Sequence, residues 1–93
     1  MTSSRKIYKV VVAEMAADFI REQPRKIQRQ IMMKIDALAE NPRGLGEPIK
    51  NSKDIFKVRS GWYRIAYQIK DDKLLVLVVR IGHRSDFYEY YDR

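Results

Sequence analysis

The 93-residue chain contains no cysteine and a single histidine, His83. Without cysteine it can form neither a disulfide framework nor a thiolate nucleophile, and a structural zinc site needs four nitrogen or sulfur ligands. Long apolar runs are also missing, since no stretch approaches the roughly 20 apolar residues of a membrane span. The apolar stretch near the N-terminus is too short for a signal peptide. We therefore expect one small domain, residues 1–93, that uses no metal or cofactor and resides in the cytoplasm.

Negative charge is scarce as well. The chain has 19 Lys and Arg residues against 12 Asp and Glu, a formal net charge of +7. Such an excess predicts a partner of opposite charge, either a nucleic acid or an acidic protein, and no membrane partner is expected. The imbalance is greatest between residues 55 and 84, where the acidic residues are Asp71 and Asp72 in one apparent turn. The strands predicted on either side of that turn are therefore cationic.

The first half of the chain predicts a strand followed by two helices. Residues 6–13 are rich in β-branched side chains, which is typical of a strand. Apolar residues in steps of three and four then predict helices at about 14–22 and 24–40, separated by Pro24. Turn-forming residues are dense over 40–48 and end the second helix. Within that helix we expect the thioether side chains of Met32 and Met33 to fill the core rather than to bind a ligand.

Three further strands are expected at about 55–60, 62–70 and 73–81, joined by short connectors that favour antiparallel pairing. The resulting order, β-α-α-β-β-β, predicts a single α+β domain with an antiparallel sheet packed against a helical hairpin. A short helix or tail is expected at 86–92.

Alternation assigns a face to most side chains of the predicted sheet, because successive residues of a strand point to opposite sides. Tyr63, Ile65, Tyr67 and Ile69 form an apolar face that suits the helices, so Arg64 points to the opposite, open face. Phe56 and Val58 are likewise apolar, and their neighbours Lys57 and Arg59 join Arg64 on the open face. The last strand is apolar on both faces, so alternation does not determine its register.

A cationic sheet face edged with aromatic rings suits RNA. Cations neutralise phosphates, and tryptophan or tyrosine rings stack on unpaired bases. The expected RNA-binding residues are Lys57, Arg59, Trp62 and Arg80. The same residue types also suit RNA cleavage, which needs a group to take the 2′-hydroxyl proton, charge stabilisation and an acid, and requires no metal. Composition and spacing leave simple binding and catalysis both open.

Two tracts carry a resemblance to a known family: "YRIAYQI" at 63–69 and "GHRSDFY" at 82–88. Together with "LAENPRG" at 38–44 and "IKNSKDIFKVRSG" at 49–61, they make the chain similar, over essentially its whole length, to the RelE-type toxins of the RelE/ParE superfamily. The resemblance implies a toxin of a type II toxin–antitoxin pair that cleaves mRNA in the ribosomal A site. In such enzymes the 2′-hydroxyl attacks the adjacent phosphate.

The resemblance also implies roles for individual residues. Arg64 falls at the family's transition-state-stabilising arginine, and Lys57 at a catalytic lysine that accepts the proton or stabilises charge. Arg84 falls at the arginine proposed as general acid, and Tyr88 at the tyrosine that stacks on or orients the base. Arg59 fits a phosphate-binding role.

Two positions depart from the family pattern. Some members carry a second lysine where this chain has Ile55, which leaves fewer candidates for the proton acceptor. His83 stands where other members have lysine and is therefore a further candidate for acid or base, because imidazole exchanges a proton near neutral pH.

The implied partners are an acidic cognate antitoxin, the ribosome and mRNA, and the resemblance allows a heterotetramer with the antitoxin. We expect the antitoxin to cover the basic face or the segment at 86–91. Two alternatives stay open: a ParE-like toxin that inhibits gyrase, and a non-catalytic basic module that binds RNA or the ribosome.

Overall fold

A computed structural model describes residues 7–50, 52 and 54–85. The elements, in chain order, are β1 (Lys9–Val12), α1 (Glu14–Arg21), α2 (Arg25–Leu38), α3 (Pro42–Leu45), β2 (Glu47–Pro48), β3 (Ile55–Ser60), β4 (Tyr63–Lys70), the 3-10 turn η1 (Asp71–Lys73) and β5 (Leu75–His83). The α+β class and the predicted order are confirmed, and α3 and β2 are added inside the segment expected to be only turns. The helix or tail expected at 86–92 lies outside the described residues. Among those residues, no helix has the length and apolar character that a membrane span requires.

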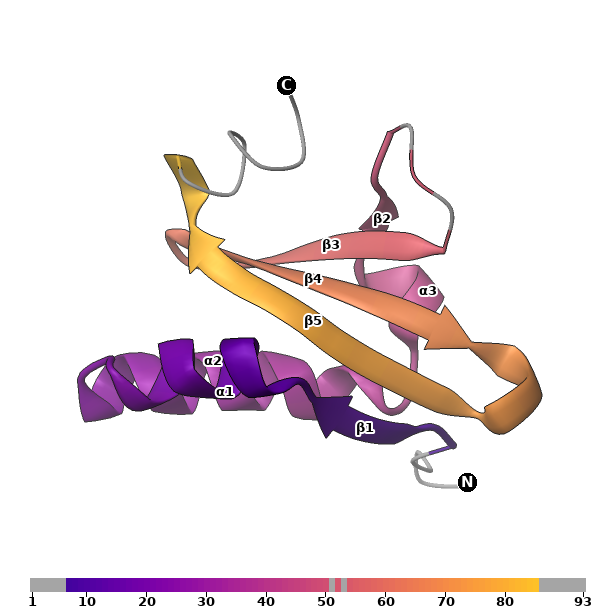
Figure 1. Ribbon diagram of the computed structural model, residues 1–93, viewed down its shortest axis with the longest axis horizontal. Helices are drawn as coiled ribbons and strands as arrows, with labels where there is room; N and C mark the ends of the chain where they lie inside the picture. Colours follow the sequence, from indigo (N-terminus) through magenta and orange to yellow (C-terminus); the bar gives the residue numbers. More distant parts are fainter. Residues whose placement is uncertain (1–6, 51, 53, 86–93) are drawn as a thin grey trace, which may run out of the picture.

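The five strands form one sheet in the order β1-β5-β4-β3-β2 (Figure 1). The meander β3–β4–β5 is antiparallel, as predicted. The whole sheet is nevertheless mixed, because β1 lies parallel to β5 with Lys9 opposite Leu75. A parallel neighbour needs a long crossover connection, and here the helices and the meander together provide it.

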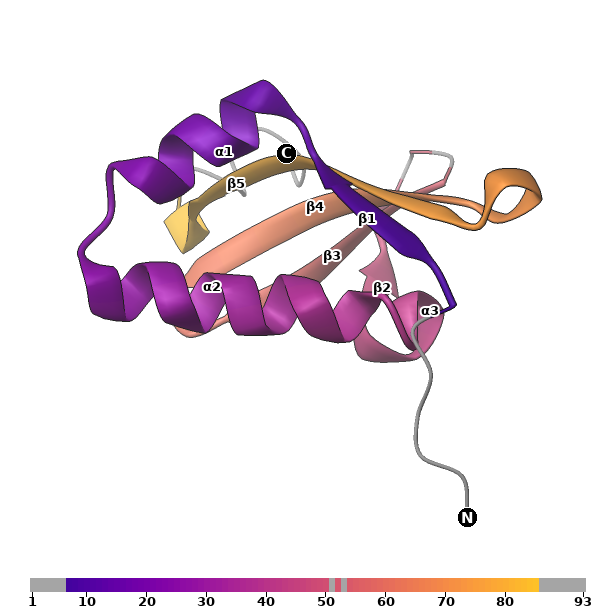
Figure 2. The ribbon, with the colours of Figure 1, turned by 90° about the horizontal axis from the view of Figure 1, so that it is seen from below.

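Both long helices pack on one face of the sheet, as Figures 1 and 2 show. Pro24 lies just before α2 in an extended conformation and separates it from α1, as expected. The core between the layers includes Ile31, Ile35 and Leu38 of α2 together with Val58, Ile65, Tyr67, Ile69, Val76, Val78 and Ile81 of the sheet. The predicted apolar faces of β3 and β4 are therefore confirmed.

A β-bulge interrupts the regular pairing of β4 with β5. Ala66 pairs with Arg80, but the next residue, Tyr67, pairs with Val78. The extra residue, Val79, packs with Ala66 on the open face, away from the helices. This bulge shifts the alternation within β5, the strand whose register could not be determined from sequence because both of its faces are apolar.

The expectation that Met32 and Met33 fill the core is wrong. Their side chains are 45% and 73% exposed. The buried stripe of α2 consists of Ile31, Ile35 and Leu38, and the two residues after Ile31 point about 100° and 200° away from it in a helix of 3.6 residues per turn. The two methionines therefore lie on the outer surface of α2.

An ionic cluster joins the start of the chain to α3 and η1. Arg43 donates two hydrogen bonds to Asp71, from Nη1 to Oδ1 at 2.8 Å and from Nη2 to Oδ2 at 2.7 Å. The Tyr8 hydroxyl donates to Asp71 Oδ1 at 2.8 Å. These bonds, the Arg43 bond first, lower the pKa of Asp71 from its ordinary value of 3.8 to about 2.

This shift predicts a loss of stability in acid. Because the folded protein holds the Asp71 pKa below its unfolded value, the contribution of Asp71 is complete above about pH 4 and disappears as the pH falls through about 2. We expect the melting temperature to fall more steeply over this range in the wild type than in Asp71→Asn. Thermal unfolding followed from pH 5 to pH 2 measures this, with Asp72→Asn as the control. Parallel curves for the wild type and Asp71→Asn would contradict the assignment.

Candidate functional site

A small pocket of about 200 Å³ opens on the face of the sheet that points away from α1 and α2. We call it the cationic pocket; its lining residues are Glu47, Lys57, Val58, Arg59 and Arg64. Three of the residues predicted from sequence, Lys57, Arg59 and Arg64, are therefore brought together. The strand register explains why: Arg59 lies directly opposite Arg64, and Glu47 directly opposite Lys57.

Arg64 is the most constrained cation of the pocket. Its side chain is buried, with 8% exposure. Nη1 donates to the backbone oxygens of Tyr63 at 3.1 Å and Gly61 at 3.3 Å. Gly61 adopts a positive φ of 62° at the β3–β4 turn, a conformation that glycine reaches without steric cost. The turn thus supplies a carbonyl oxygen that holds the guanidinium in place.

Glu47 is the pocket residue that sequence reasoning missed. It lies in β2, inside the segment predicted to be only turns. A β-carbon on Gly46 would come within 2.5 Å of the Lys57 backbone oxygen, so glycine is what allows β2 to approach β3 this closely. The available signal was the sequence Gly-Glu-Pro, because proline is compatible with an edge strand.

Two of the remaining predicted residues lie at the β3–β4 turn. Trp62 is 66% exposed there, and its backbone oxygen accepts a hydrogen bond from the Arg84 backbone nitrogen at 2.8 Å. Arg84 follows β5, two residues beyond Gly82, the residue that pairs with Arg64. Neither side chain lines the cationic pocket, but both residues lie at the end of the sheet where Arg64 is held.

His83 and Arg80 do not line the cationic pocket. His83 contacts the Tyr63 ring edge-on, with centroids 5.8 Å apart, and its Nδ1 lies 3.4 Å from Ser85 Oγ. Arg80 reaches the start of α1, with Nη1 3.3 Å from the sulfur of Met15. Tyr88 lies outside the described residues.

The cationic pocket suits a phosphodiester. Three cations around one hollow can bind a phosphate and stabilise the extra negative charge that develops on it during substitution. The carboxylate of Glu47 adds a group that can accept a proton. Within the residues described here, no three histidine or carboxylate side chains gather into a metal-binding group.

Comparison with known proteins adds a second line of observation. The family model described as the ParE toxin of the type II toxin–antitoxin system parDE matches residues 6–88. Toxin RelG of Mycobacterium tuberculosis is 30% identical over 66 residues, which are 70% of this chain and 76% of that protein. The mRNA interferase toxin RelE of Escherichia coli is 32% identical over 61 residues, 63% of this chain and 64% of that protein.

A solved structure has the same fold. The toxin–antitoxin complex RelBE2 of Mycobacterium tuberculosis contains a chain that matches with a TM-score of 0.76 and 26% sequence identity. The match covers 83% of this chain and 98% of that one.

The stabilities of two variants, one at each of the paired residues Arg59 and Arg64, test how Arg64 is held in the pocket. Arg64→Ala removes a buried side chain and its bonds to two carbonyl oxygens, so we expect the free energy of unfolding to fall by about 1–3 kcal/mol. Arg59→Ala, on the exposed partner directly opposite, should change it by less than about 0.5 kcal/mol. Urea denaturation of both variants measures the difference. Equal effects would mean that Arg64 is not held as described.

Proposed function

Since the chain belongs to the ParE toxin family of type II toxin–antitoxin systems and is a RelE-type toxin, we propose that it is an endoribonuclease that cleaves mRNA in the ribosomal A site. The observation that carries the proposal is the cationic pocket, in which Lys57, Arg59 and the buried Arg64 line one hollow. The similarity to a relative named mRNA interferase supports it.

The proposed reaction is an internal substitution at phosphorus. The 2′-oxygen of one nucleotide forms a bond to the adjacent phosphorus, and the bond from phosphorus to the 5′-oxygen of the next nucleotide breaks. The products are a 2′,3′-cyclic phosphate and a 5′-hydroxyl. Arg64 stabilises the charge on the five-coordinate phosphorus. Arg84, with His83 as the alternative, gives a proton to the leaving oxygen, and Tyr88 orients the base.

The proton of the 2′-hydroxyl needs an acceptor, and the pocket offers two candidates. A carboxylate oxygen can accept a proton, and a lysine side chain can stabilise negative charge on a phosphate. We therefore assign the acceptor role to Glu47 and charge stabilisation to Lys57, its partner across the strands. Lys57 as acceptor, a role that the resemblance to RelE-type toxins allows, is the alternative that the variants below distinguish.

Charge also identifies the partner class. A protein with a net charge of +7 and a cationic pocket is suited to an acidic inhibitor. One structural relative was solved as a toxin–antitoxin complex. We propose that an acidic antitoxin binds this chain in the cytoplasm and covers the basic face. The proposed assembly is a heterotetramer of toxin and antitoxin.

Inhibition of gyrase is the second candidate, because the family model carries the name ParE. Toxins of that kind act by binding a protein and have no use for a phosphate-binding pocket. A basic module that only binds RNA or the ribosome is the third candidate. It would use the cations for affinity alone.

Mapping of mRNA 5′ ends in a reconstituted translation system tests the function. We expect cuts within A-site codons and no cuts in the same RNA without ribosomes. Arg64→Ala and Arg64→Lys, assayed where both are folded, should lower the cleavage rate about 10²- to 10³-fold while ribosome binding persists. Lys26→Ala, on the exposed surface of α2, is the charge-matched control. A protein that blocks gyrase supercoiling and leaves translated mRNA intact would refute the proposal.

A second pair of variants assigns the proton acceptor. Glu47→Gln keeps the size of the side chain but removes the basic oxygen, so we expect the single-turnover cleavage rate to fall about 10²- to 10⁴-fold. Lys57→Arg keeps a positive charge and should retain most of the rate if Lys57 only stabilises charge. The reverse ranking, with Glu47→Gln active and Lys57→Arg inactive, would show that Lys57 is the acceptor.

A further inference from the structure

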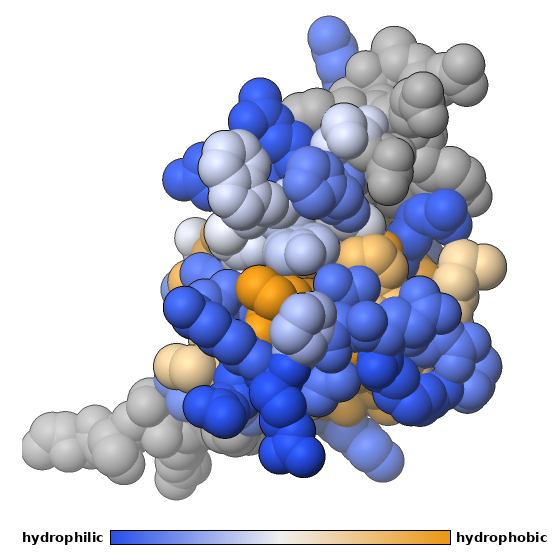
Figure 3. Space-filling model, turned by 90° about the vertical axis from the view of Figure 1, so that its left-hand side faces the viewer, coloured by the Kyte–Doolittle hydropathy of each residue, from blue (hydrophilic) through white to orange (hydrophobic). Residues whose placement is uncertain are grey.

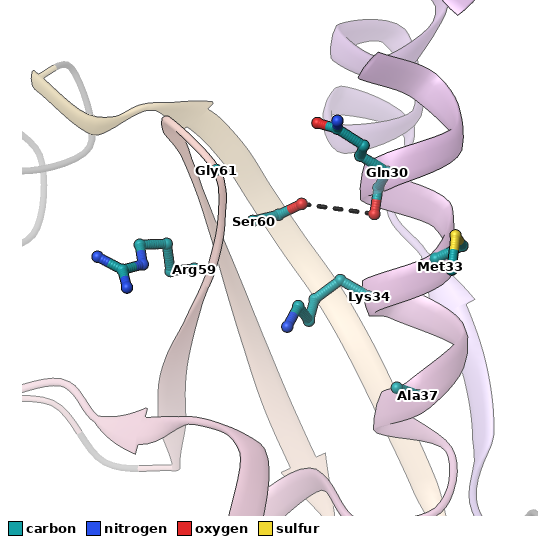
Figure 4. Close-up of a pocket in the computed structure, with 7 residues that line it drawn as sticks. All are labelled: Gln30, Met33, Lys34, Ala37, Arg59, Ser60 and Gly61. Carbon is teal, nitrogen blue, oxygen red and sulfur yellow. Dashed lines mark hydrogen bonds between the residues drawn. The ribbon is translucent and has the colours of Figure 1, made fainter. Parts of the chain in front are cut away.

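A second, larger hollow lies between α2 and the end of β3 (Figure 4). We call it the α2 groove; it is lined by Gln30, Met33, Lys34 and Ala37 of α2 and by Arg59, Ser60 and Gly61. Its volume is about 540 Å³, within the range of roughly 300–1,000 Å³ typical of sites for small molecules. The hollow is therefore large enough for a nucleotide.

The α2 groove and the cationic pocket share one wall, because Arg59 lines both. β2 pairs with β3 only at Phe56 and Lys57, so in the described part of the chain no strand covers the edge of β3 beyond that point. Figure 4 shows Lys34 pointing from α2 toward β3, while Arg59 points from β3 away from α2. An RNA strand held in the pocket would reach the groove by passing Arg59.

The groove lining has the chemistry of a nucleotide site. Lys34 is a cation that suits a phosphate, and none of the described residues that line the hollow is a carboxylate. Met33, which is 73% exposed, and Ala37 offer an apolar wall for the face of a base. The Gln30 amide can donate and accept hydrogen bonds at a base edge, the means by which proteins read unpaired RNA bases.

Figure 3 shows that the end of the molecule containing the α1–α2 connection is mostly hydrophilic, with hydrophobic side chains between the polar ones.

We propose that the α2 groove binds the mRNA nucleotide adjacent to the cleaved phosphate. Lys34 contacts the sugar–phosphate backbone, and Gln30 contacts the edge of the base. The groove then determines which nucleotide is preferred next to the cut, whereas the cationic pocket performs the cleavage. The inference rests on the proposed nuclease function, so its test includes a measurement that does not depend on cleavage.

The first test compares cleavage maps over a library of A-site codons and flanking nucleotides. Gln30→Ala should weaken the preference at one position next to the cut by about fivefold or more, relative to the other positions of the same map. Lys26→Ala, on the same helix and outside the groove, should reproduce the wild-type map. An unchanged map for Gln30→Ala would overturn the inference even if cleavage itself is confirmed.

The second test measures binding of a single-stranded oligoribonucleotide of mixed sequence, with 2′-O-methyl groups that prevent cleavage. Fluorescence anisotropy over a series of salt concentrations gives the salt dependence of the affinity. Lys34→Ala should reduce the slope of log affinity against log salt by about 0.7, the value for one phosphate contact on a single strand. Lys26→Ala should leave the slope unchanged.

The outcomes separate the two proposals. Absence of any cleavage with the Lys34 effect on binding intact would refute the nuclease function but retain the groove as an RNA site. A Lys34→Glu variant with unaltered RNA binding and a weakened complex with the antitoxin would instead identify the groove as a protein-docking surface. That result would overturn the inference.

Discussion

Successive side chains of a β-strand point to opposite faces, and in β3 and β4 this alternation separates a hydrophobic core from a cationic surface. Ile65 and Tyr67 are fully buried against the helices, while Arg64, the residue just before Ile65, lines the pocket on the other side. A slip of one residue in the register would exchange the two faces. Correct packing of the core and assembly of the cationic pocket therefore depend on the same backbone pairing.

Burial makes Arg64 different from the other cations of the pocket. A guanidinium removed from water loses hydration and needs hydrogen-bond partners, which the backbone oxygens of Gly61 and Tyr63 supply. A charge held away from water acts more strongly on a nearby phosphate, because the local dielectric constant is lower. It also requires little rearrangement when negative charge develops. The β3–β4 turn thus prepares the electrostatic environment that the proposed reaction needs.

Much of the fold and part of the site could be predicted from sequence, where the rules are local. Helical spacing and Pro24 predicted α1 and α2, and alternation predicted the convergence of Lys57, Arg59 and Arg64. The rest depends on contacts between distant segments. The parallel placement of β1 requires knowledge of where β5 lies, and the bulge at Val79 arises from the pairing of two strands. Met32 and Met33 were misassigned because their hydrophobicity was given more weight than their angular position on α2.

Glu47 illustrates the same limit at the site itself. Its segment is rich in turn-forming residues, and β2 is only two residues long. The sequence Gly-Glu-Pro is compatible with an edge strand, but it does not identify Lys57 as the residue opposite Glu47. The resemblance to RelE-type toxins likewise implies cationic site residues and gives no role to this carboxylate.

The parallel pairing of β1 with β5 has a consequence for how the protein is made. Lys9 lies opposite Leu75, so β1 can take its place only after β5 has emerged from the translating ribosome. Contacts between residues so far apart in sequence form slowly, because the intervening chain must first be ordered. β5 must thus be synthesised before the sheet can close, and the Arg64 pairing with Gly82 of β5 forms only then. In a nascent chain of this fold, the strand that flanks Arg64 on the β5 side is added after the residues that line the cationic pocket.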